Sequence, residues 1–442
     1  MRPPTREYWI QIEGRDDRGW EMVPNAIDRM HGGYHTRYVE RVLKYRRYKP
    51  PERGGRGPWE EPDDRKVNPW DLNELNPSMT DGSIPGPTLE CSVGESGVGE
   101  DIVIHFRNDD QRTLPFSHRC HSMHPHGILF PTKYDGSYPL SPPDDPSSAA
   151  GSDEFDPDNR IENDADIRAL WHRAGTMGAY KQGDRVPPGG TFTYRWRTHG
   201  NRNTAGVWLY HDHSIHDADN VRMGAIGFLV IHDGEDEEDI FIDYDTDPET
   251  FAAYLPDSSP AGDAAYLDER DPNVKRLRKP PEAAQYLQLY HELATPIVRD
   301  GNVSLQSVGM AINGRTFLGS APTLIAGAET KMRFGVGAMN ENTFHTFHIH
   351  GHRWILKRHG EYVSQLEDTR ILGPAESFHF TIQQGSSLGP PTHGNGVLGE
   401  WHMHCHVLGH MMPGGMMGSL LVIDDTNPRL GDVLQSGMSH SH

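Results

Sequence analysis

The stretch WHMHCHVLGHMMPGGMMGSLLVI, residues 401–423, matches an earlier stretch of the same chain, WLYHDHSIHDADNVRMGAIGFLVI, residues 208–231. Both contain a tryptophan, a His-x-His pair, a loop with methionine and a final apolar run. A second repeat relates SMHPHGILF, residues 122–130, to TFHIHGHRWIL, residues 346–356, through His-x-His-Gly. Repetition at this spacing predicts two copies of one fold along the chain.

From residue 81 onward the chain alternates short apolar runs with turn residues, which predicts strands. Examples are DIVIHFRN (101–108) and GTFTYRW (190–196) in the first copy, and KMRFGVG (331–337) and SFHFTI (377–382) in the second. Strands of this length are typical of a β-sandwich or barrel. The 47 glycines and 34 prolines also disfavour a mainly helical protein. We therefore expect an all-β fold.

The domain organisation follows from these repeats and from changes in composition. The N-terminal extension carries a basic run, Arg37 to Lys49, which indicates either a solvated arm or an arm on an acidic neighbouring surface such as another subunit. The expected parts are an N-terminal extension or arm (1–80), a first domain (81–235) with an acidic insertion (137–186), an acidic linker (236–282) and a second domain (283–442).

Composition excludes some classes of function. The net charge of −21 argues against nucleic-acid binding. No run of about 18 apolar residues is present, so we expect no transmembrane helix and no membrane partner. The start, MRPPTREYWIQIEG, has no apolar stretch like that of a secretory signal. Three cysteines cannot form a disulfide scaffold; Cys91 and Cys120 could pair or remain buried thiols.

Histidine pairs are the most informative pattern in the sequence. Random placement of 27 histidines would give roughly 1.6 His-x-His pairs. Residues i and i+2 of a strand share a face, so both imidazoles of a pair can reach one metal cluster. Imidazole suits copper, iron, nickel and zinc, which leaves the metal open. The seven pairs are 124/126, 211/213, 348/350, 350/352, 402/404, 404/406 and 440/442.

The segment His404-Cys405-His406 narrows the choice of metal. Strand alternation turns Cys405 away from the face that its two neighbours share, so the thiolate serves a different metal. Together with His345, His410 and a methionine of the loop HMMPGGMM, it makes the ligand set of a blue-copper site. An electron that arrives at this site can then pass through Cys405 and one peptide step to the histidine cluster. This connection favours reduction of dioxygen over hydrolysis.

These motifs resemble those of the multicopper oxidase family, of the laccase-like, two-domain type. The resemblance covers residues 81–232 and 283–424 and implies two cupredoxin-like Greek-key β-sandwich domains with an N-terminal extension. The similar segments are HPHG (124–127), HDH (211–213), HTFHIHGH (345–352) and HCHVLGH (404–410), together with PGPT (85–88), INGR (312–315) and EDTR (367–370).

The resemblance also implies a cofactor and roles for named residues. The cofactor is copper, four ions per subunit equivalent: one type 1, one type 2 and a type 3 pair. Asp135 matches the family's acidic residue that delivers protons near the trinuclear centre. The implied ligands are His124 and His348 for type 2, His126, His211, His213, His350, His404 and His406 for type 3, and His345, Cys405 and His410 for type 1.

The sequence departs from the family pattern in the type 1 loop. In the family, the axial methionine usually follows the last histidine ligand by five residues, and this chain has Gly415 at that position. If the loop has a one-residue insertion, Met416 is the axial ligand. We prefer this assignment to Met417 or to a site without methionine. Met411 stands where some members carry an acidic residue, so the second proton-delivery residue is unassigned.

In the first repeat, Asp212 occupies the cysteine position, which excludes a second blue-copper site. His216 and Met223 resemble remnants of a matching loop, although ordinary packing is the favoured interpretation. His352 and His402 are expected to make hydrogen bonds near the cluster instead of binding copper. His118 and His121 have no motif support.

Residues 236–282 are too short for a third copy, so we expect two domains. In the two-domain oxidases that the chain resembles, the trinuclear cluster forms between domain 1 of one subunit and domain 2 of the next. This implies a homotrimer closed head to tail.

The leading functional interpretation is a laccase-like oxidase that takes electrons from a small reducing substrate, such as a phenol, and gives them to O₂. The alternatives are a metallo-oxidase acting on Cu(I), Fe(II) or Mn(II), a copper nitrite reductase, and a copper-storage protein. Asp212 in place of a first-domain cysteine disfavours the nitrite reductase. The resemblance favours a periplasmic or extracellular location.

Overall fold

Strands make up almost all the regular structure of the computed structural model. The structure describes residues 3–22, 37–63, 84–131, 134–137, 183–235, 265–268, 271–277, 283–316, 324–327, 330–358, 361–383, 399–412 and 414–423. The expectation of an all-β fold is confirmed, with two four-stranded sheets in the first sandwich and sheets of six and five strands in the second.

The first sandwich carries its outer sheet in the order β4-β1-β6-β8 and its inner sheet in the order β5-β10-β9-β7. Tyr194, Trp196 and Phe106 are fully or almost fully buried between the two sheets. The outer strands are β4 (Leu43–Tyr48), β1 (Thr5–Gly14), β6 (Asp101–Asp110) and β8 (Thr191–Arg197), and the inner strands are β5 (Leu89–Ser92), β10 (Ile226–His232), β9 (Gly206–His211) and β7 (His124–Pro125).

Two strands of the first sandwich come from the predicted N-terminal extension, and this corrects the expectation of an arm outside the fold. Strand β1 lies parallel to β6 over its whole length, with Ile10 opposite Phe106, and β4 pairs with the other edge of β1. Tyr8, Ile10 and Ile12 alternate toward the core and are buried, because side chains of a strand point to opposite faces in turn.

The second sandwich has a six-stranded sheet, β14-β13-β16-β21-β18-β19, and a five-stranded sheet, β15-β23-β22-β17-β20. Phe334, Phe347 and Phe380 lie in the buried core, where Trp354 stacks on Phe380. The strands are β13 (Ala283–Arg299), β14 (Asn302–Ile312), β15 (Leu324–Gly327), β16 (Lys331–Met339), β17 (His345–Ile349), β18 (Trp354–Arg358), β19 (Glu361–Glu367), β20 (Thr369–Leu372), β21 (Ser377–Gln383), β22 (Gly399–Cys405) and β23 (Met417–Ile423).

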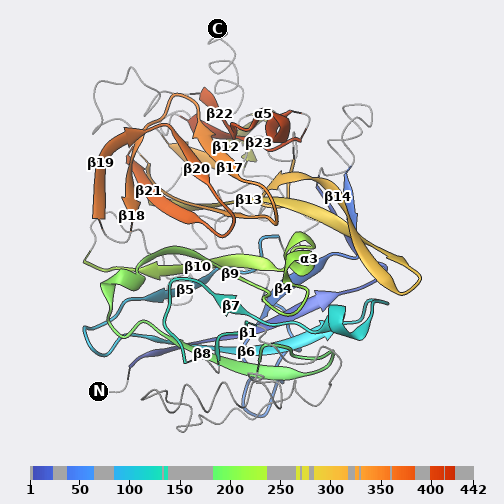
Figure 1. Cartoon of the computed structure of the whole chain (residues 1–442). Coiled ribbons are helices and arrows are strands. Elements are labelled where there is room, and N and C mark those ends of the chain that lie inside the picture. The colour runs from blue at the N-terminus through green and yellow to red at the C-terminus, as the bar shows by residue number, and fades with distance from the viewer. Residues whose placement is uncertain are drawn as a thin grey trace.

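The inner sheet of the first sandwich packs against the six-stranded sheet of the second. Val207, Leu209 and Phe228 join Leu289 in one buried cluster. The Ser377 hydroxyl donates to the Val207 carbonyl at 2.7 Å. The four sheets therefore follow one another as layers, and the six-stranded sheet lies between the inner sheet of the first sandwich and the five-stranded sheet (Figure 1).

A short N-terminal hairpin, β2 (Gly19–Glu21) and β3 (Tyr38–Glu40), ties the two sandwiches together. The Trp20 indole donates to the Gly314 carbonyl at 2.7 Å, and the Arg315 guanidinium lies 4.4 Å from the Trp20 ring centroid. Trp20 is buried in a cluster with Leu293 and Ala311 of the second sandwich. The hairpin thus adds a second set of contacts between the two domains, beside the packing of their sheets.

The described part of the basic run pairs with acidic residues of its own chain. Arg47 lies 3.2 Å from Asp63, Arg46 lies 3.8 Å from Glu13, and Arg41 lies 3.2 Å from Asp16. These partially exposed pairs are each expected to contribute about 1 kcal/mol or less to stability. The alternative of an acidic surface on another subunit is not needed to explain these residues.

Parts of the predicted insertion and linker are described. Strands β11 (Ala265–Asp268) and β12 (Asp271–Leu277) form an antiparallel pair within the predicted linker. Of the insertion over 137–186, only residues 137 and 183–186 are described, and His440 and His442 lie outside the described residues.

Cys91 and Cys120 are both buried and not bonded to each other. Within the described ranges, no helix has the length and apolar character needed to cross a membrane.

Candidate functional site

Three residues predicted to hold a type 1 copper lie together in the second sandwich. Cys405 ends β22, His345 begins β17, and His410 lies in the short helix α5 (Leu408–Met411). The two strands are paired, with Phe347 opposite Cys405. Cys405 Sγ lies 3.6 Å from His345 Nδ1 and 3.8 Å from His410 Nδ1, and the two nitrogens are 3.2 Å apart.

This triangle fits a single metal ion. Sides of this length leave room for an ion about 2 Å from each atom, the usual metal–nitrogen distance. Burial, and then the neighbouring His410, lowers the pKa of His345 to about 3, so its imidazole is neutral at neutral pH. Burial raises the pKa of the Cys405 thiol, and a bound metal would deprotonate it. A His₂Cys set of this kind suits copper.

The methionine loop is anchored to the same triangle. The Met416 carbonyl accepts from Cys405 N at 3.1 Å, and Met416 N donates to the His410 carbonyl at 3.0 Å. Met416 is fully buried, whereas Met417 starts β23 and lies opposite His404. These contacts support Met416 over Met417 as the axial ligand, which remains a proposal.

The first histidine quartet, His124, His126, His211 and His213, forms at one end of the inner sheet of the first sandwich. Strands β7 and β9 pair with His124 opposite His211. His126 Nε2 and His211 Nε2 are 3.1 Å apart. Burial, and then the neighbouring His124, lowers the pKa of His126 to about 4. The neutral nitrogens are therefore available to a metal at neutral pH.

The second quartet, His348, His350, His404 and His406, repeats this arrangement on the five-stranded sheet. His348 lies opposite His404, and Nε2 of His350 is 3.1 Å from Nε2 of His404. Burial, and then His348, lowers the pKa of His350 to about 4. His350 and His406 are exposed.

Main-chain carbonyls orient corresponding rings in both quartets. His211 Nδ1 bonds to the Asp212 carbonyl at 2.8 Å, and His404 Nδ1 bonds to the Cys405 carbonyl at 3.0 Å. In each case Nδ1 donates, which leaves Nε2 as the free acceptor that a metal requires.

Acidic loops hold the ring of the first histidine in each quartet. His124 Nδ1 bonds to the Asp135 carbonyl at 2.7 Å and lies 3.1 Å from the Asp135 carboxylate. His348 Nδ1 bonds to the Asp368 carbonyl at 2.7 Å. The structure thus places Asp135 beside the predicted type 2 ligand, where its proposed role in proton delivery is geometrically possible.

The two quartets do not meet within one chain. Among the described residues, no hydrogen bond or ring contact joins a histidine of one quartet to a histidine of the other. The quartets belong to the inner sheet of the first sandwich and to the five-stranded sheet of the second, and the six-stranded sheet lies between them (Figure 1).

The nearby histidines have structural partners. His352 Nδ1 donates to the His350 carbonyl at 2.8 Å, in line with the expected hydrogen-bonding role. The His402 carbonyl accepts from His350 N at 2.8 Å. His118 and His216 stack with ring centroids 3.4 Å apart, and with Asp219 they form a further group of possible ligands.

Sequence reasoning missed the role of His121. This residue is fully buried, with Nδ1 2.6 Å from Asp212 Oδ2 and Nε2 2.9 Å from Asp110 Oδ2. Burial opposes its charge, but the two carboxylates outweigh burial and raise the pKa of His121. A signal was available: His121 precedes His124 by three residues, as His345 precedes His348.

A glycine shapes the turn after the first histidine pair. Gly127 has φ +74°, and a Cβ there would lie 2.1 Å from the Trp208 ring, whose indole is fixed by a hydrogen bond to the Thr204 carbonyl. We predict that Gly127→Ala destabilises the protein by about 3 kcal/mol or more.

Gly97→Ala is the matched control, because Gly97 has φ +77° and nothing within 4 Å of the added methyl. It should cost only about 1 kcal/mol, the strain of the left-handed backbone alone. Urea denaturation of both variants measures the difference. Equal losses of stability would show that contact with Trp208 is not the cause.

A buried histidine near the type 1 triangle predicts acid sensitivity. His291 lies in β13, is almost fully buried and accepts from Gly314 N at 3.0 Å. Burial lowers its pKa to about 3. Between about pH 6.5 and pH 3 the unfolded chain binds a proton there and the folded chain does not, so stability falls as pH falls.

From pH 7 to pH 5, this single group should remove about 2 kcal/mol of the free energy of unfolding, a loss that His291→Gln abolishes. Urea denaturation of chelator-treated protein at both pH values measures it, and the difference between wild type and variant cancels other titrating groups. The same change at the exposed His199 is the control. Parallel pH profiles for wild type and His291→Gln would contradict the prediction.

The described residues define a cupredoxin-fold protein with one His₂Cys group and two histidine quartets, a ligand set suited to several copper ions. The fold is that of a solved multicopper oxidase, which is 16% identical, covers 95% of this chain and 89% of that chain, and has a TM-score of 0.50. No family model matches the sequence.

Curated relatives agree with the multicopper oxidase resemblance, which is confirmed. Ferroxidase HEPHL1 of Mus musculus is 24% identical over 361 residues, covering 78% of this chain and 24% of that protein. A probable nitrite reductase-hydroxylamine oxidoreductase fusion protein of Kuenenia stuttgartiensis is 23% identical over 343 residues, covering 77% of this chain and 28% of that protein. The chain thus spans about a quarter of the length of these relatives.

Proposed function

We propose that the protein is a copper-dependent oxidase that couples one-electron oxidation of a small reductant to the four-electron reduction of O₂ to water. The observation that carries this proposal is the placement of Cys405. Its side chain belongs to the type 1 triangle, while its neighbours in the chain, His404 and His406, belong to the second quartet.

Bound copper would supply the one-electron redox chemistry and the site of O₂ reduction. The chain supplies neutral imidazoles, a buried thiol and rings oriented by carbonyl groups. The balance requires four electrons and four protons for each O₂ that yields two waters. Asp135, beside His124, is our candidate for holding one of these protons near the cluster.

We further propose that the trinuclear centre forms between chains, in a homotrimer. Each quartet provides four imidazoles, and the six-stranded sheet separates the two quartets of one chain. A head-to-tail contact brings the first quartet of one chain to the second quartet of the next, and three such contacts close a ring. Exposed apolar side chains near both quartets, Leu129 at 43% and Ile371 at 57%, are suited to burial in that contact.

A small organic reductant such as a phenol is the substrate class that we favour. His410 is partially exposed, and apolar side chains lie around it: Leu408 is 65% exposed, Met412 58% and Phe344 49%. The nearby carboxylate of Glu292 is paired with Arg222 at 3.1 Å. Arg222 also pairs with Glu341 at 3.1 Å, so the apolar rim is the feature that suits an aromatic ring better than a metal cation.

A metallo-oxidase acting on Cu(I), Fe(II) or Mn(II) is the second candidate. The mouse relative named above is a ferroxidase, and so is a human relative of the same name. Oxygen consumption by the copper-loaded protein decides between the two. Faster uptake with phenols than with these ions supports the first proposal, and the reverse supports the second. Copper binding with no uptake for any reductant would indicate storage, and nitrite reduction without oxygen uptake would indicate a nitrite reductase.

A further inference from the structure

We propose that Asp212 and His121 form a positioning pair, a metal-free cross-link that sets the spacing of the copper ligands in the first quartet. The inference rests on the proposed function, since it concerns how this chain prepares a copper site. Asp212 lies between the ligands His211 and His213, and His121 lies three residues before His124.

The pair occupies the position that the type 1 triangle has in the other sandwich. Asp212 stands where Cys405 stands, in the middle of His-x-His, and His121 stands where His345 stands. Met223 follows Asp212 by the same interval that separates Met416 from Cys405. In the second sandwich a bound metal would add a link between the paired strands β17 and β22; in the first, side chains add the corresponding link between the segments that lead to the paired strands β7 and β9.

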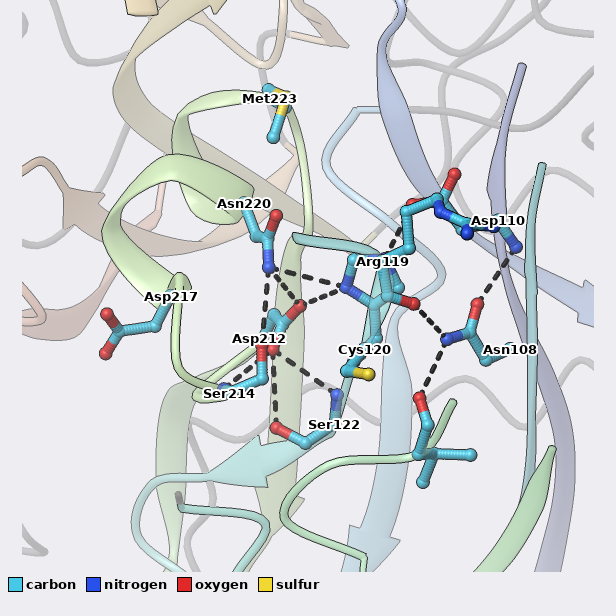
Figure 2. A network of polar contacts seen from close by, with 12 residues as sticks. Asn108, Asp110, Arg119, Cys120, Ser122, Asp212, Ser214, Asp217, Asn220 and Met223 are labelled. Atoms are coloured by element: carbon cyan, nitrogen blue, oxygen red, sulfur yellow. Dashed lines mark hydrogen bonds and ion pairs between the residues drawn. The ribbon is translucent and has the colours of Figure 1, made fainter. Parts of the chain in front are cut away.

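Asp212 is the centre of this cross-link (Figure 2). Its two oxygens interact with His121 Nδ1 at 2.6 Å, Ser214 N at 2.8 Å and Asn220 Nδ2 at 3.0 Å, and with Ser122 N at 3.3 Å. Asp212 and His121 are fully buried. The carboxylate therefore joins the segment before His124 to the segment that carries His211 and His213.

Ser122 extends the link to a ligand residue itself. Its hydroxyl accepts from His213 N at 3.1 Å and lies 3.4 Å from Asp212 Oδ1. The main chain of His213 is thus held through Ser122 to the segment that leads to His124. His213 Nδ1 is also 3.0 Å from the Asp217 carboxylate, in the helix α3 (Asp217–Arg222) that packs over the network.

A second layer of charge holds His121 from the other side. Asp110 lies 2.9 Å from His121 Nε2 and is paired with Arg112 at 2.7 Å, and all three side chains are fully buried. Arg112 Nη1 lies 3.0 Å from the Met223 sulfur. The pocket is therefore filled and electrostatically balanced by the chain's own groups, with two carboxylates, one guanidinium and an imidazole between the acids.

The consequence is that the first quartet keeps its spacing before copper binds. Side chains that orient metal ligands typically contribute about 10- to 100-fold to metal affinity. Among the described residues of the second sandwich, the buried Cys405 thiol instead has weak contacts with His345, His410 and the backbone of Thr346 and Val407.

The test compares the full-length, copper-loaded protein with Asp212→Asn and with the matched change Asp63→Asn, which alters another buried carboxylate, one that pairs with Arg47 of β4 at 3.2 Å. Asp212→Asn should weaken copper binding at the trinuclear centre by about 10-fold or more and alter the type 2 electron paramagnetic resonance signal. It should leave the blue absorption of the Cys405 site, which reports a folded second domain. Asp63→Asn should keep both.

Ser122→Ala provides a milder variant that retains all buried charges, and it should speed loss of trinuclear copper to a chelator several-fold. Unchanged copper content and spectra in Asp212→Asn and Ser122→Ala would overturn the positioning role, as would equal losses in Asp212→Asn and Asp63→Asn. Failure of the wild-type chain to bind copper would instead overturn the proposed function.

Discussion

Replacing Cys405 with serine is expected to abolish the blue colour and reduce oxidase turnover to the uncatalysed background. Serine has nearly the same volume as cysteine, so the fully buried position stays filled. A hydroxyl does not supply the thiolate that defines a His₂Cys copper site. The loss of function should therefore occur without loss of the fold.

Visible absorption, oxygen consumption and thermal unfolding of the copper-loaded variant measure these effects together. The matched control is Cys120→Ser, which changes another fully buried free cysteine in the first sandwich, far in the sequence from the triangle. The control should remain blue and active. A Cys405→Ser protein that stays blue would refute the assignment of the type 1 site.

Two inactive variants are expected to regain activity when they assemble together. His211→Ala removes a ligand of the first quartet, and His404→Ala removes a ligand of the second. In a head-to-tail ring, the intact first quartet of a His404→Ala chain can meet the intact second quartet of a His211→Ala chain. Random mixing of equal amounts should restore about one quarter of the wild-type turnover. At each shared centre the first quartet is intact in about half of the cases, and so, independently, is the second quartet.

The experiment requires unfolding or co-expression so that chains exchange, followed by oxygen consumption and light scattering on the mixed assembly. The control mixes His211→Ala with a chain carrying both substitutions, which never brings two intact quartets together. Persistent inactivity of the first mixture, in assemblies shown to contain both chains, would contradict a centre shared between chains. A fully active monomer would do the same.

The grouping of the histidines could be predicted from the sequence because its geometry is local. His-x-His on a strand places two rings on one face wherever the strand lies, and the pairing of His124 with His211 and of His348 with His404 follows from two repeats of one fold. The separation of Cys405 from its neighbours depends on the same alternation.

The features that the sequence did not reveal depend on distant partners. Strand β1 has no clean alternation of apolar and polar residues, because Trp9 follows Tyr8, and its place in the sheet depends on β6, which lies far along the chain. Strand β4, LKYRRY, carries the basic run but buries Leu43 and Tyr45. The repeat aligns His121 with His345, but its contacts with Asp110 and Asp212 depend on residues distant in the sequence.

The hairpin β2–β3 has a consequence for how many chains an assembly contains. In a head-to-tail ring, the rotation from one subunit to the next is set by the angle between the two domains of each chain. Trp20, held by Gly314 and Arg315, helps to hold that angle from inside the chain, together with the packing of the inner sheet on the six-stranded sheet. In the proposed ring, an angle that does not divide a full turn would produce an open helical filament with an unpaired quartet at each end.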